Sequence, residues 1–549
     1  MVFVLAEWNL SVAVVVVVIV ATTLYRWRRW QLSFFKRIGI PGPEPCLIAG
    51  NFDQLWTEDT IKVMNEWSTR YGDIYGIYIG DAPFLMVKDL ELLRRVLITD
   101  FALFMDRGDV WATMNGNNYI QQALSFAKGN RWKFTRRSVS PAFTASKMRK
   151  MVGEMTNTVE RFLDLLEARC REAVDGEANV YPLLGSLAFD VVAETACGLY
   201  LDVQHKPNDQ YFNSARSFML NIVENAYQRT GQFFSKVKAI LSVTCMLEQQ
   251  FGSEPLTALA RKAEAIAALR ARDQSLARQD VIQSLLNAKV PQELLGLSEF
   301  RERIDDKGHF LMPLRHVATN TATLLVAGFE TVSAIASTCV FCLAKYSEIQ
   351  EKVRQEVIAV YEKHGGFTYD AIKDLTYTKQ TIDETMRLYP PVVAFTSRKA
   401  SCDYHYKDMI IPKGVNIMAC TEQIHRDPRF WNRPEEFDPD SMKCSEGGGG
   451  GRNVLHYCAS SSMFRRFSPE QKAARHPLAF QPFGAGIRNC VGMRLAQVEM
   501  TLIVAKLVHR FRLHLGSRHA NSEFERKTQS IIASPKNGVW VRVEKIQKR

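Results

Sequence analysis

The chain opens with a long apolar run that ends at a basic cluster. Residues 10–24 read LSVAVVVVVIVATTL, and RWRRW follows from residue 26. With the residues before it, this run reaches the roughly 20 mostly apolar residues that span a bilayer. Because the arginines follow the run, the positive-inside rule places Met1 in the lumen and the body in the cytosol. We predict a single-pass transmembrane signal anchor at residues 1–25. A cleaved signal peptide would need a basic start and a small-residue cleavage site.

A stiff linker and a strand hairpin follow the apolar run. Residues 26–45 are basic at their start and end in PGPEP, and proline-rich segments are stiff and cannot continue a helix. Residues 74–87 read IYGIYIGDAPFLMV, which predicts short strands on either side of a Gly-Asp-Ala-Pro turn. From residue 88 to residue 366 the apolar spacing is mostly helical. We expect the chain to turn at the linker, between the membrane and the body.

The rest of the chain adds short strands but no regular alternation of strands with helices. Strands are expected between residues 404 and 419, with a turn at residues 412–414, and at residues 539–543. A doubly wound fold would need strand and helix to alternate, and the sequence has no such run. The pattern therefore predicts a mainly α fold with small β-sheets, in one large domain over residues 46–549.

Composition narrows the classes of function. The chain is 46% hydrophobic and 23% charged, which is typical of a globular protein with a large core. Its net charge of +12 suits an anionic membrane surface or an acidic partner protein. Nucleic-acid binding is not expected, because we find no finger, zipper or stacking motif. The eleven cysteines are scattered, which argues against a disulfide framework or a zinc ribbon and favours a reducing compartment.

One segment differs in composition from its surroundings. Residues 441–465 read SMKCSEGGGGGRNVLHYCASSSMFR, with a run of glycines and a run of serines. Glycine runs lose the most conformational freedom on folding. We interpret the segment as a disordered insert, either a mobile surface loop or a translated intron; a functional insert is the alternative.

A glycine-rich stretch presents a cysteine just before a predicted helix. Residues 483–492 read FGAGIRNCVG, and apolar residues recur at helical spacing after them. A helix N-terminus favours an anion and lowers the pKa of a thiol there, so Cys490 is expected to be a thiolate. A dinucleotide loop is excluded because Asn489 stands where a third glycine is needed. The thiolate could be a nucleophile, which would need a histidine base, or a metal ligand. A buried structural cysteine is the third alternative.

The same stretch resembles the haem-binding loop of the cytochromes P450. Its pattern FxxGxxxCxG is matched by Phe483, Gly486, Cys490 and Gly492. The resemblance implies a cytochrome P450 fold, haem b as cofactor and Cys490 as the axial ligand of the haem iron. It also implies that Arg488 contacts a haem propionate. The resemblance runs from the PGPEP linker to the C-terminus, and the wording is most similar to the animal branch that includes family 3 and thromboxane synthase.

A second motif resembles the oxygen-binding helix of this family. Residues 321–338, TATLLVAGFETVSAIAST, form an apolar run around AGFET. A glycine, and a threonine hydroxyl that competes for a backbone carbonyl, can open a helix locally and make room for dioxygen. The resemblance implies that Thr331 supports the bound dioxygen and that Glu330 helps to relay protons. Taken alone, the motif would be read as a core helix with an exposed Glu-Thr pair.

A third motif is interrupted by the unusual segment. Glu384 and Arg387 stand three positions apart, on one face of a predicted helix, where a solvated pair would be the ordinary interpretation. In the family this pair is buried and joined by a second arginine in an FxPxRF stretch. Here FDPD ends at residue 440, and removal of residues 441–465 would give FDPDRFSPEQ. We therefore predict Arg466 as the third member of the network.

Further arginines are implied as contacts of the haem propionates. Trp132 and Arg136 match the WxxxR motif of the family, and arginine forks bind carboxylates well. Without the resemblance, this stretch would be read as an ordinary amphipathic helix. Arg398 is a further candidate, in a segment one residue longer than is usual for the family.

The resemblance implies a haem-thiolate monooxygenase. Such an enzyme inserts one oxygen atom of O2 into a lipophilic small molecule, a xenobiotic, steroid or fatty acid. Its electrons would come from NADPH through NADPH-cytochrome P450 reductase, a flavin protein on the same endoplasmic reticulum membrane. Basic residues near the haem loop, Lys133, Arg137 and Arg494, are candidates to dock that reductase, or are merely solvated. The alternatives are a haem-thiolate isomerase of peroxides, similar to thromboxane synthase, and a non-catalytic haem protein disabled by the insert.

Overall fold

A long N-terminal helix precedes a mainly helical body. The computed structural model describes residues 2–546 apart from 56–58, 110–118, 222–225, 252–254, 394, 441–465, 468, 520–522 and 530. The predicted insert at residues 441–465 therefore lies outside the described residues. The prediction of a mainly α fold with small β-sheets is confirmed by the helices and strands that follow.

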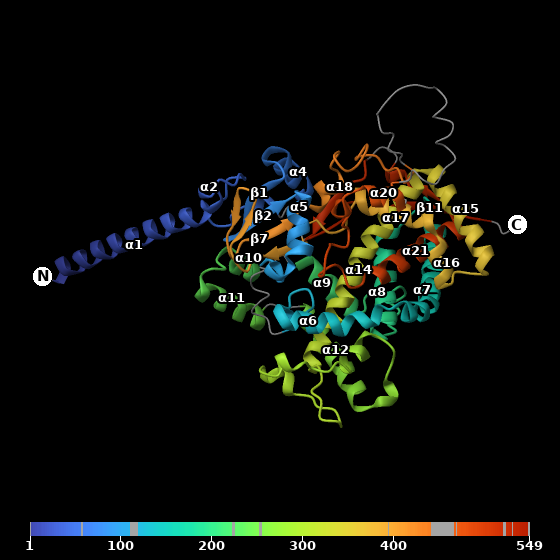
Figure 1. Ribbon diagram of the computed structural model, residues 1–549, viewed down its shortest axis with the longest axis horizontal. Coiled ribbons are helices and arrows are strands. Elements are labelled where there is room, and N and C mark those ends of the chain that lie inside the picture. Colours follow the sequence, from blue (N-terminus) through green and yellow to red (C-terminus); the bar gives the residue numbers. More distant parts are fainter. Residues whose placement is uncertain are drawn as a thin grey trace, which may run out of the picture.

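Helix α1 (Val2–Leu32) extends from the body as an arm (Figure 1). The large apolar side chains between residues 12 and 24 are exposed, as in a helix that faces lipid. Near its end, Arg28 is only 6% exposed and donates to the carbonyl oxygens of Leu47 and Ile48 at 2.9 and 2.7 Å. These bonds fasten the helix to the body, and its transmembrane role stays a prediction.

Helix α14 (Leu314–Lys345) is the centre of the core, and α8 (Val180–Cys197) and α12 (Pro255–Arg272) pack along it. Among the described residues, α8 and α14 are long and apolar enough to cross a membrane, but 83% and 72% of their apolar windows are buried. Burial in the protein explains their hydrophobicity, so they are core helices. The other helices of the body are α2 (Phe34–Arg37), α3 (Phe52–Leu55), α4 (Thr60–Tyr71), α5 (Leu90–Arg94), α6 (Gly129–Val139), α7 (Ala145–Glu172), α9 (Gln210–Asn221), α10 (Ala226–Phe233), α11 (Lys238–Phe251), α13 (Val281–Leu286), α15 (Ser347–His364), α16 (Tyr369–Asp374), α17 (Thr376–Leu388), α18 (Thr421–His425), α20 (Pro469–Ala474) and α21 (Met493–Arg510).

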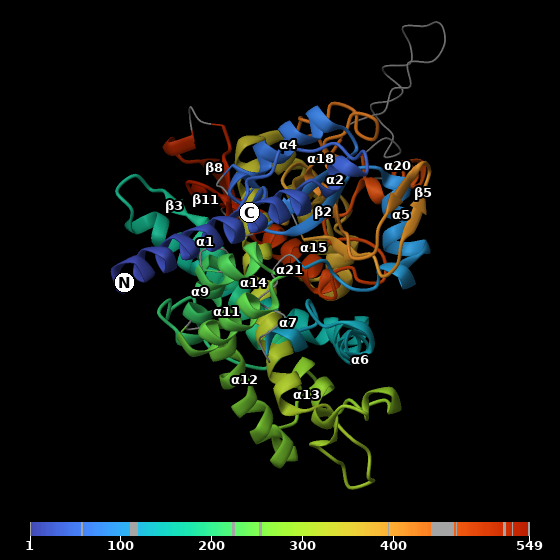
Figure 2. The ribbon, with the colours of Figure 1, turned by 90° about the vertical axis from the view of Figure 1, so that its left-hand side faces the viewer.

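The largest sheet joins distant parts of the chain. Strands β1 (Ile74–Ile79) and β2 (Ala82–Val87) form the predicted hairpin, and β2 pairs in parallel with β7 (Asn416–Ala419), which pairs with β4 (Ser397–Lys399). Figures 1 and 2 both show this sheet on the upper side of the body and helices α11 and α12 on the lower side. The sheet therefore brings the N-terminal hairpin beside the segment that carries Arg398.

The remaining strands form small separate sheets. These are β5 (Tyr404–Tyr406) with β6 (Met409–Ile411), β9 (Arg526–Gln529) with β10 (Ile532–Pro535), and β11 (Trp540–Lys545) between β3 (Ala178–Asn179) and β8 (Phe511–Leu515). The predicted strand at residues 539–543 is thus confirmed as β11. The turn at residues 412–414 links β6 to β7 in another sheet, whereas the local hairpin turns earlier, at Lys407, whose φ is +51°. Sequence spacing alone did not separate these two turns.

Candidate active site

The cysteine loop is folded tightly in front of α21. The amide of Cys490 donates to the carbonyl of Phe483 at 2.9 Å, which closes the loop. Gly486 has a φ of +71°, and a Cβ at this position would lie 1.9 Å from the carbonyl oxygen of Leu97. Only glycine combines this left-handed backbone with so close an approach. Gly486 therefore shapes the loop against the α5 side of the body, and it is not among the residues that line the cavity below.

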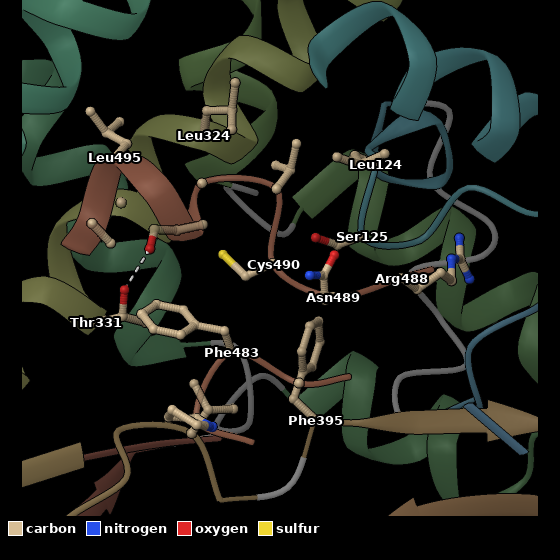
Figure 3. A pocket seen from close by; sticks show the side chains of 18 of the residues that line it. Leu124, Ser125, Leu324, Thr331, Phe395, Phe483, Arg488, Asn489, Cys490 and Leu495 are labelled. Carbon is tan, nitrogen blue, oxygen red and sulfur yellow. Dashed lines mark hydrogen bonds between the residues drawn. The ribbon is translucent and has the colours of Figure 1, made fainter. Parts of the chain in front are cut away.

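The thiol of Cys490 opens into an internal cavity. Figure 3 shows its sulfur projecting into the space that Thr331 and Phe483 also line. Cys490 is exposed, and the surface that it exposes faces this cavity. Burial inside the protein raises the pKa of the Cys490 thiol above its ordinary value, while a backbone hydrogen bond with Gly492 and the charges of Arg136 and Arg107 act in the opposite direction. The expected lowering by the helix N-terminus is therefore wrong in sign for the thiol without a metal, because desolvation outweighs it.

Buried and half-buried arginines gather beside this cavity. Arg136, Arg398 and Arg488 were expected there, and all three line it together with Arg107, which the sequence did not indicate. Burial lowers the pKa of Arg107 to about 10, of Arg488 to about 9, and of Arg398 well below its usual range. Neighbouring arginines lower them further. Each guanidinium is therefore held where its positive charge is costly.

Backbone carbonyls hold these arginines in place. Arg136 donates to the carbonyl and side-chain oxygens of Asn489, both at 2.8 Å, which ties α6 to the cysteine loop. Arg107 donates to the carbonyl of Phe395 at 2.9 Å. Arg488 lies with its guanidinium carbon 4.5 Å from the ring centre of Trp132, which is 4% exposed. Trp132 thus supports an arginine as well as lining the cavity.

The arrangement leaves positive charge without a matching carboxylate. Among the described residues, none of the arginines named above forms an ion pair, and the Nε atoms of Arg107 and Arg398 are buried without a hydrogen-bond partner. Nearby Asp106 offsets part of the charge at Arg488 only. A flat dianion in the cavity would satisfy these groups, and haem carries a propionate pair beside a macrocycle of suitable shape. The residues present therefore fit a haem, whose propionates the arginines would hold and whose iron Cys490 would ligate.

Helix α14 forms the opposite wall of the cavity. Ala327, Gly328 and Thr331 line it, and the Thr331 hydroxyl donates to the Ala327 carbonyl at 2.9 Å. This bond was expected to open the helix, but α14 is continuous from Leu314 to Lys345. A Cβ on Gly328 would lie 2.9 Å from a methyl of Val192, so this glycine lets α8 pack closely.

Glu330 does not face the cavity. Consecutive helical residues diverge by about 100°, so Glu330 and Thr331 cannot point the same way. The structure turns the Glu330 carboxyl outward, where Tyr181 of α8 donates a hydrogen bond to its Oε1. Burial raises the pKa of Glu330, and the bond from Tyr181 and the charges of Arg216 and Lys527 oppose that rise.

Behind the cysteine loop lies a buried charge network. Glu384 and Arg387 are fully buried, and Arg387 Nε and Nη2 donate to the two carboxylate oxygens at 2.8 and 2.9 Å. Arg466 Nη1 donates to Oε1 of the same carboxylate, as does the amide of Asp438 at 3.0 Å. Arg466 is 5% exposed, and its Nη2 also donates to the carbonyl of Asn432 at 2.6 Å and to the carbonyl of the residue that follows Asn432. The structure thus brings Arg466 to the place expected from the interrupted motif.

The other cysteines that the structure describes do not form a metal site. The expectation that the cysteines are scattered without a Cys-x-x-Cys pair is wrong for Cys339 and Cys342, which form such a pair within α14. Both are buried, and burial raises the pKa of Cys339 to about 12 and that of Cys342 further, so they remain thiols in an apolar core. In the part of the chain that the structure describes, no three histidine, cysteine or acidic side chains gather as a metal site.

Comparison with known families decides the identity of this fold. The family model of the cytochromes P450 matches residues 40–446 and 460–541. The chain belongs to the cytochrome P450 family. Members of this P450 family bind haem through its iron, and this P450 is accordingly an oxidoreductase of the monooxygenase type. The model leaves residues 447–459 unmatched, and these lie within the segment of unusual composition.

Curated relatives of this P450 include members of family 3. It is 27% identical to cytochrome P450 3A5 of Homo sapiens over 498 residues, which cover 89% of this chain and 88% of the relative. It is 26% identical to cytochrome P450 3A14 of Cavia porcellus over 504 residues, which cover 89% and 88% of the two chains. It is 26% identical to lithocholate 6-beta-hydroxylase of Mesocricetus auratus over 556 residues, which cover 97% of each chain. The resemblance drawn from the motifs is confirmed.

Some cavity residues of this P450 carried no signal in the sequence. Arg107 is one of them. No motif around Arg107 indicates that the fold places it beside the cysteine loop, which lies hundreds of residues later in the sequence. Glu499 of α21 is another: it lines the cavity, is 2% exposed, and burial raises its pKa well above the ordinary range. Its apolar neighbours at helical spacing made it look like one polar residue on an amphipathic helix.

Proposed function

We propose that this P450 oxidises lipophilic small molecules, such as xenobiotics, steroids or fatty acids, with electrons from NADPH delivered by NADPH-cytochrome P450 reductase. The observation that carries the proposal is the cavity in which the Cys490 sulfur, the Thr331 face of α14 and a set of unpaired arginines meet. This cavity combines a lone thiol, cations without an ion-pair partner and an apolar wall.

Each of these groups has a proposed role. Cys490 would ligate the haem iron, and Phe483 and Gly486 fix the shape of its loop. The propionates are held by the arginines and the indole that line the cavity, namely Trp132, Arg136, Arg398, Arg488 and Arg107. When bound, the haem supplies an iron centre that binds dioxygen and cleaves its O–O bond, which thiolate donation favours. Thr331 supports the dioxygen with its hydroxyl, and Glu330 supplies protons.

The lining of the cavity supports a lipophilic substrate. Apolar side chains, among them Leu124, Leu324, Val392 and Phe395, line the space above the cysteine loop. Ser125 is a polar group of the lining that could orient a substrate, whereas the buried Asn320 amide is already hydrogen-bonded to the backbone at Leu124, Gln122 and His316. The name of the hamster relative states a hydroxylation of lithocholate, which agrees with this class of substrate. Shape and hydrophobic contact would then select the position that is oxidised.

A membrane setting and an acidic redox partner are part of the same proposal. Helix α1 would anchor the enzyme in the endoplasmic reticulum, with its N-terminus in the lumen and the body in the cytosol. Lys133 and Arg137 are exposed on α6, and Arg494 is exposed on the first turn of α21. These cations lie on elements that hold the cysteine loop from outside, so a partner docked on them would be close to the haem.

A reduced, carbon-monoxide-treated sample tests the thiolate assignment. The red-shifted Soret band of the family is expected for the purified protein and should disappear in Cys490→Ala. A surviving band in that variant would refute the axial assignment. Product formation should require both NADPH and the reductase. Conversion of a peroxide at full rate without them would instead identify a haem-thiolate isomerase, and absence of any turnover with an intact band would identify a non-catalytic haem protein.

A further inference from the structure

The carboxyl of Glu330 is bonded on the side of α14 that faces away from the cavity. Its partner is the hydroxyl of Tyr181, on the first turn of α8. The same two helices also meet at Gly328, where a Cβ would lie 2.9 Å from Val192, about three turns further along α8. The bond therefore joins two packed helices and does not involve a loop.

The surroundings of this bond identify a small polar cluster. Beside Tyr181, the charges that act on Glu330 are Arg216 of α9 and Lys527 of β9. Both favour the carboxylate, while burial disfavours it and raises the pKa of Glu330. Burial, and next the charge of Glu330 and the hydrogen bond to it, raise the pKa of Tyr181 far above its ordinary value, so its hydroxyl keeps its proton and remains a donor. Tyr181 and Glu330 each keep part of their surface exposed.

The Glu330 carboxyl does not lie where it could deliver a proton to the cavity. Thr331 faces the cavity, and Glu330 in the position described does not line it. A carboxyl that serves the cavity must leave the Tyr181 hydroxyl and rotate around the edge of α14. The strength of the Tyr181 bond therefore controls how often the carboxyl is free to do so. A hydrogen bond to an ionised group is among the stronger ones in proteins.

We propose that Tyr181 is a positioning residue for Glu330: its hydroxyl holds the carboxyl on the outer face of α14 and so governs proton delivery toward Thr331. This inference rests on the proposed monooxygenase function, because only that reaction needs protons in the cavity. The role concerns the orientation and proton affinity of Glu330, and Tyr181 itself does not touch the substrate or the haem site.

Loss of the hydroxyl should change the titration of Glu330 in a defined direction. The bond stabilises the carboxylate, so Tyr181→Phe should raise the pKa of Glu330 by about one unit. The change can be read in the ferric holoenzyme at rest, as the infrared carbonyl stretch of the protonated carboxyl. Subtraction of the Glu330→Gln spectrum identifies the band. Tyr346→Phe is a matched control, because Tyr346 stacks on Phe437 at 5.3 Å, away from this cluster.

The same variants are then compared in turnover. Tyr181→Phe should shift the pH profile of product formed per NADPH upward by the same amount as the infrared titration, and Tyr346→Phe should leave both unchanged. A Glu330 band that titrates at the wild-type pH in Tyr181→Phe would overturn the inference, even if activity falls, because a purely structural role lowers activity without moving the titration. A wild-type enzyme without NADPH-dependent product would overturn the proposed function instead, and the titration would still report on the contact.

Discussion

Replacement of Arg466 tests whether the interrupted motif stabilises the fold. The side chain is 5% exposed and donates to Glu384 Oε1, to the Asn432 carbonyl at 2.6 Å and to the Glu436 carbonyl at 3.1 Å. In Arg466→Met the volume is largely kept, but a fully buried carboxylate loses one of its two cationic partners. Loss of one partner from a buried ion network costs about 3–5 kcal/mol.

The expected change in melting temperature follows from the size of the chain. An unfolding entropy of about 2.1 cal/mol/K per residue gives about 1 kcal/mol per degree over about 500 ordered residues. Arg466→Met should therefore lower the melting temperature of the holoenzyme by about 3–5 °C. The assay follows both the circular dichroism and the carbon-monoxide band during heating. The haem band should be lost together with the helix signal, because the network lies behind the cysteine loop.

A surface arginine nearby provides the matched control. Arg433 pairs with Glu436 and Asp438 at 2.7 Å each, but its side chain is 51% exposed. Exposed pairs contribute about 0–1 kcal/mol, so Arg433→Met should lower the melting temperature by about 1 °C or less. Equal melting temperatures for the two variants would refute the reasoning. If Arg466→Met yields no haem protein, Arg466→Lys, which keeps a charge, should restore part of the yield, and no recovery in Arg466→Lys would contradict the role of the charge.

Further expectations concern the haem, acid stability and the inserted segment. Arg107→Met should weaken haem binding by about 10- to 100-fold, seen as faster transfer of haem to an apo-acceptor, and an unchanged rate would contradict the propionate role. Burial lowers the pKa of His425 from 6.5 to about 3. Between these pH values the unfolded chain binds a proton that the folded chain does not, so the free energy of unfolding should fall as pH falls, by about 1.4 kcal/mol per pH unit from this residue. His425→Gln should flatten the slope by that amount, and an unaltered slope would exclude His425 as its source. Deletion of residues 441–465 should leave the carbon-monoxide band and the melting temperature at least as high as in the full chain, and their loss would show that the segment is part of the fold.

The elements that were predictable from sequence are those fixed by local pattern. The hairpin at residues 74–87 follows from alternating strand residues around a turn, and α21 follows from apolar residues at helical spacing. The position of Arg466 was also predictable, because a short motif becomes continuous once the intervening residues are removed. Such signals can be recognised in a single sequence because each depends on a few neighbouring residues.

What the sequence could not predict depends on contacts between distant segments. The outward direction of Glu330 is set by Tyr181, which belongs to another helix. The raised pKa of the Cys490 thiol depends on how deeply the fold buries it, and a helix N-terminus alone suggested the opposite direction. Arg107 reaches the cavity only because its loop folds against Phe395. The direction of a side chain, its desolvation and its contacts with distant segments depend on tertiary structure. The neighbouring residues in a single sequence indicate little about them.

The charge network also explains how the chain can accommodate residues 441–465. Asp438, just before the segment, and Arg466, just after it, donate to the same oxygen of Glu384. Asp440 is held as well, by Lys352 at 2.7 Å and by the Tyr377 hydroxyl at 2.9 Å. The two flanks are therefore brought together by the folded body, and the segment only has to connect them. Closing a flexible loop of about 25 residues costs about 3 kcal/mol of chain entropy, comparable to the loss of one partner from the network itself. An insertion at this point is thus tolerable because Glu384 binds both of its flanks, and the same segment placed inside α17 or the cysteine loop would separate residues that must lie within one turn of each other.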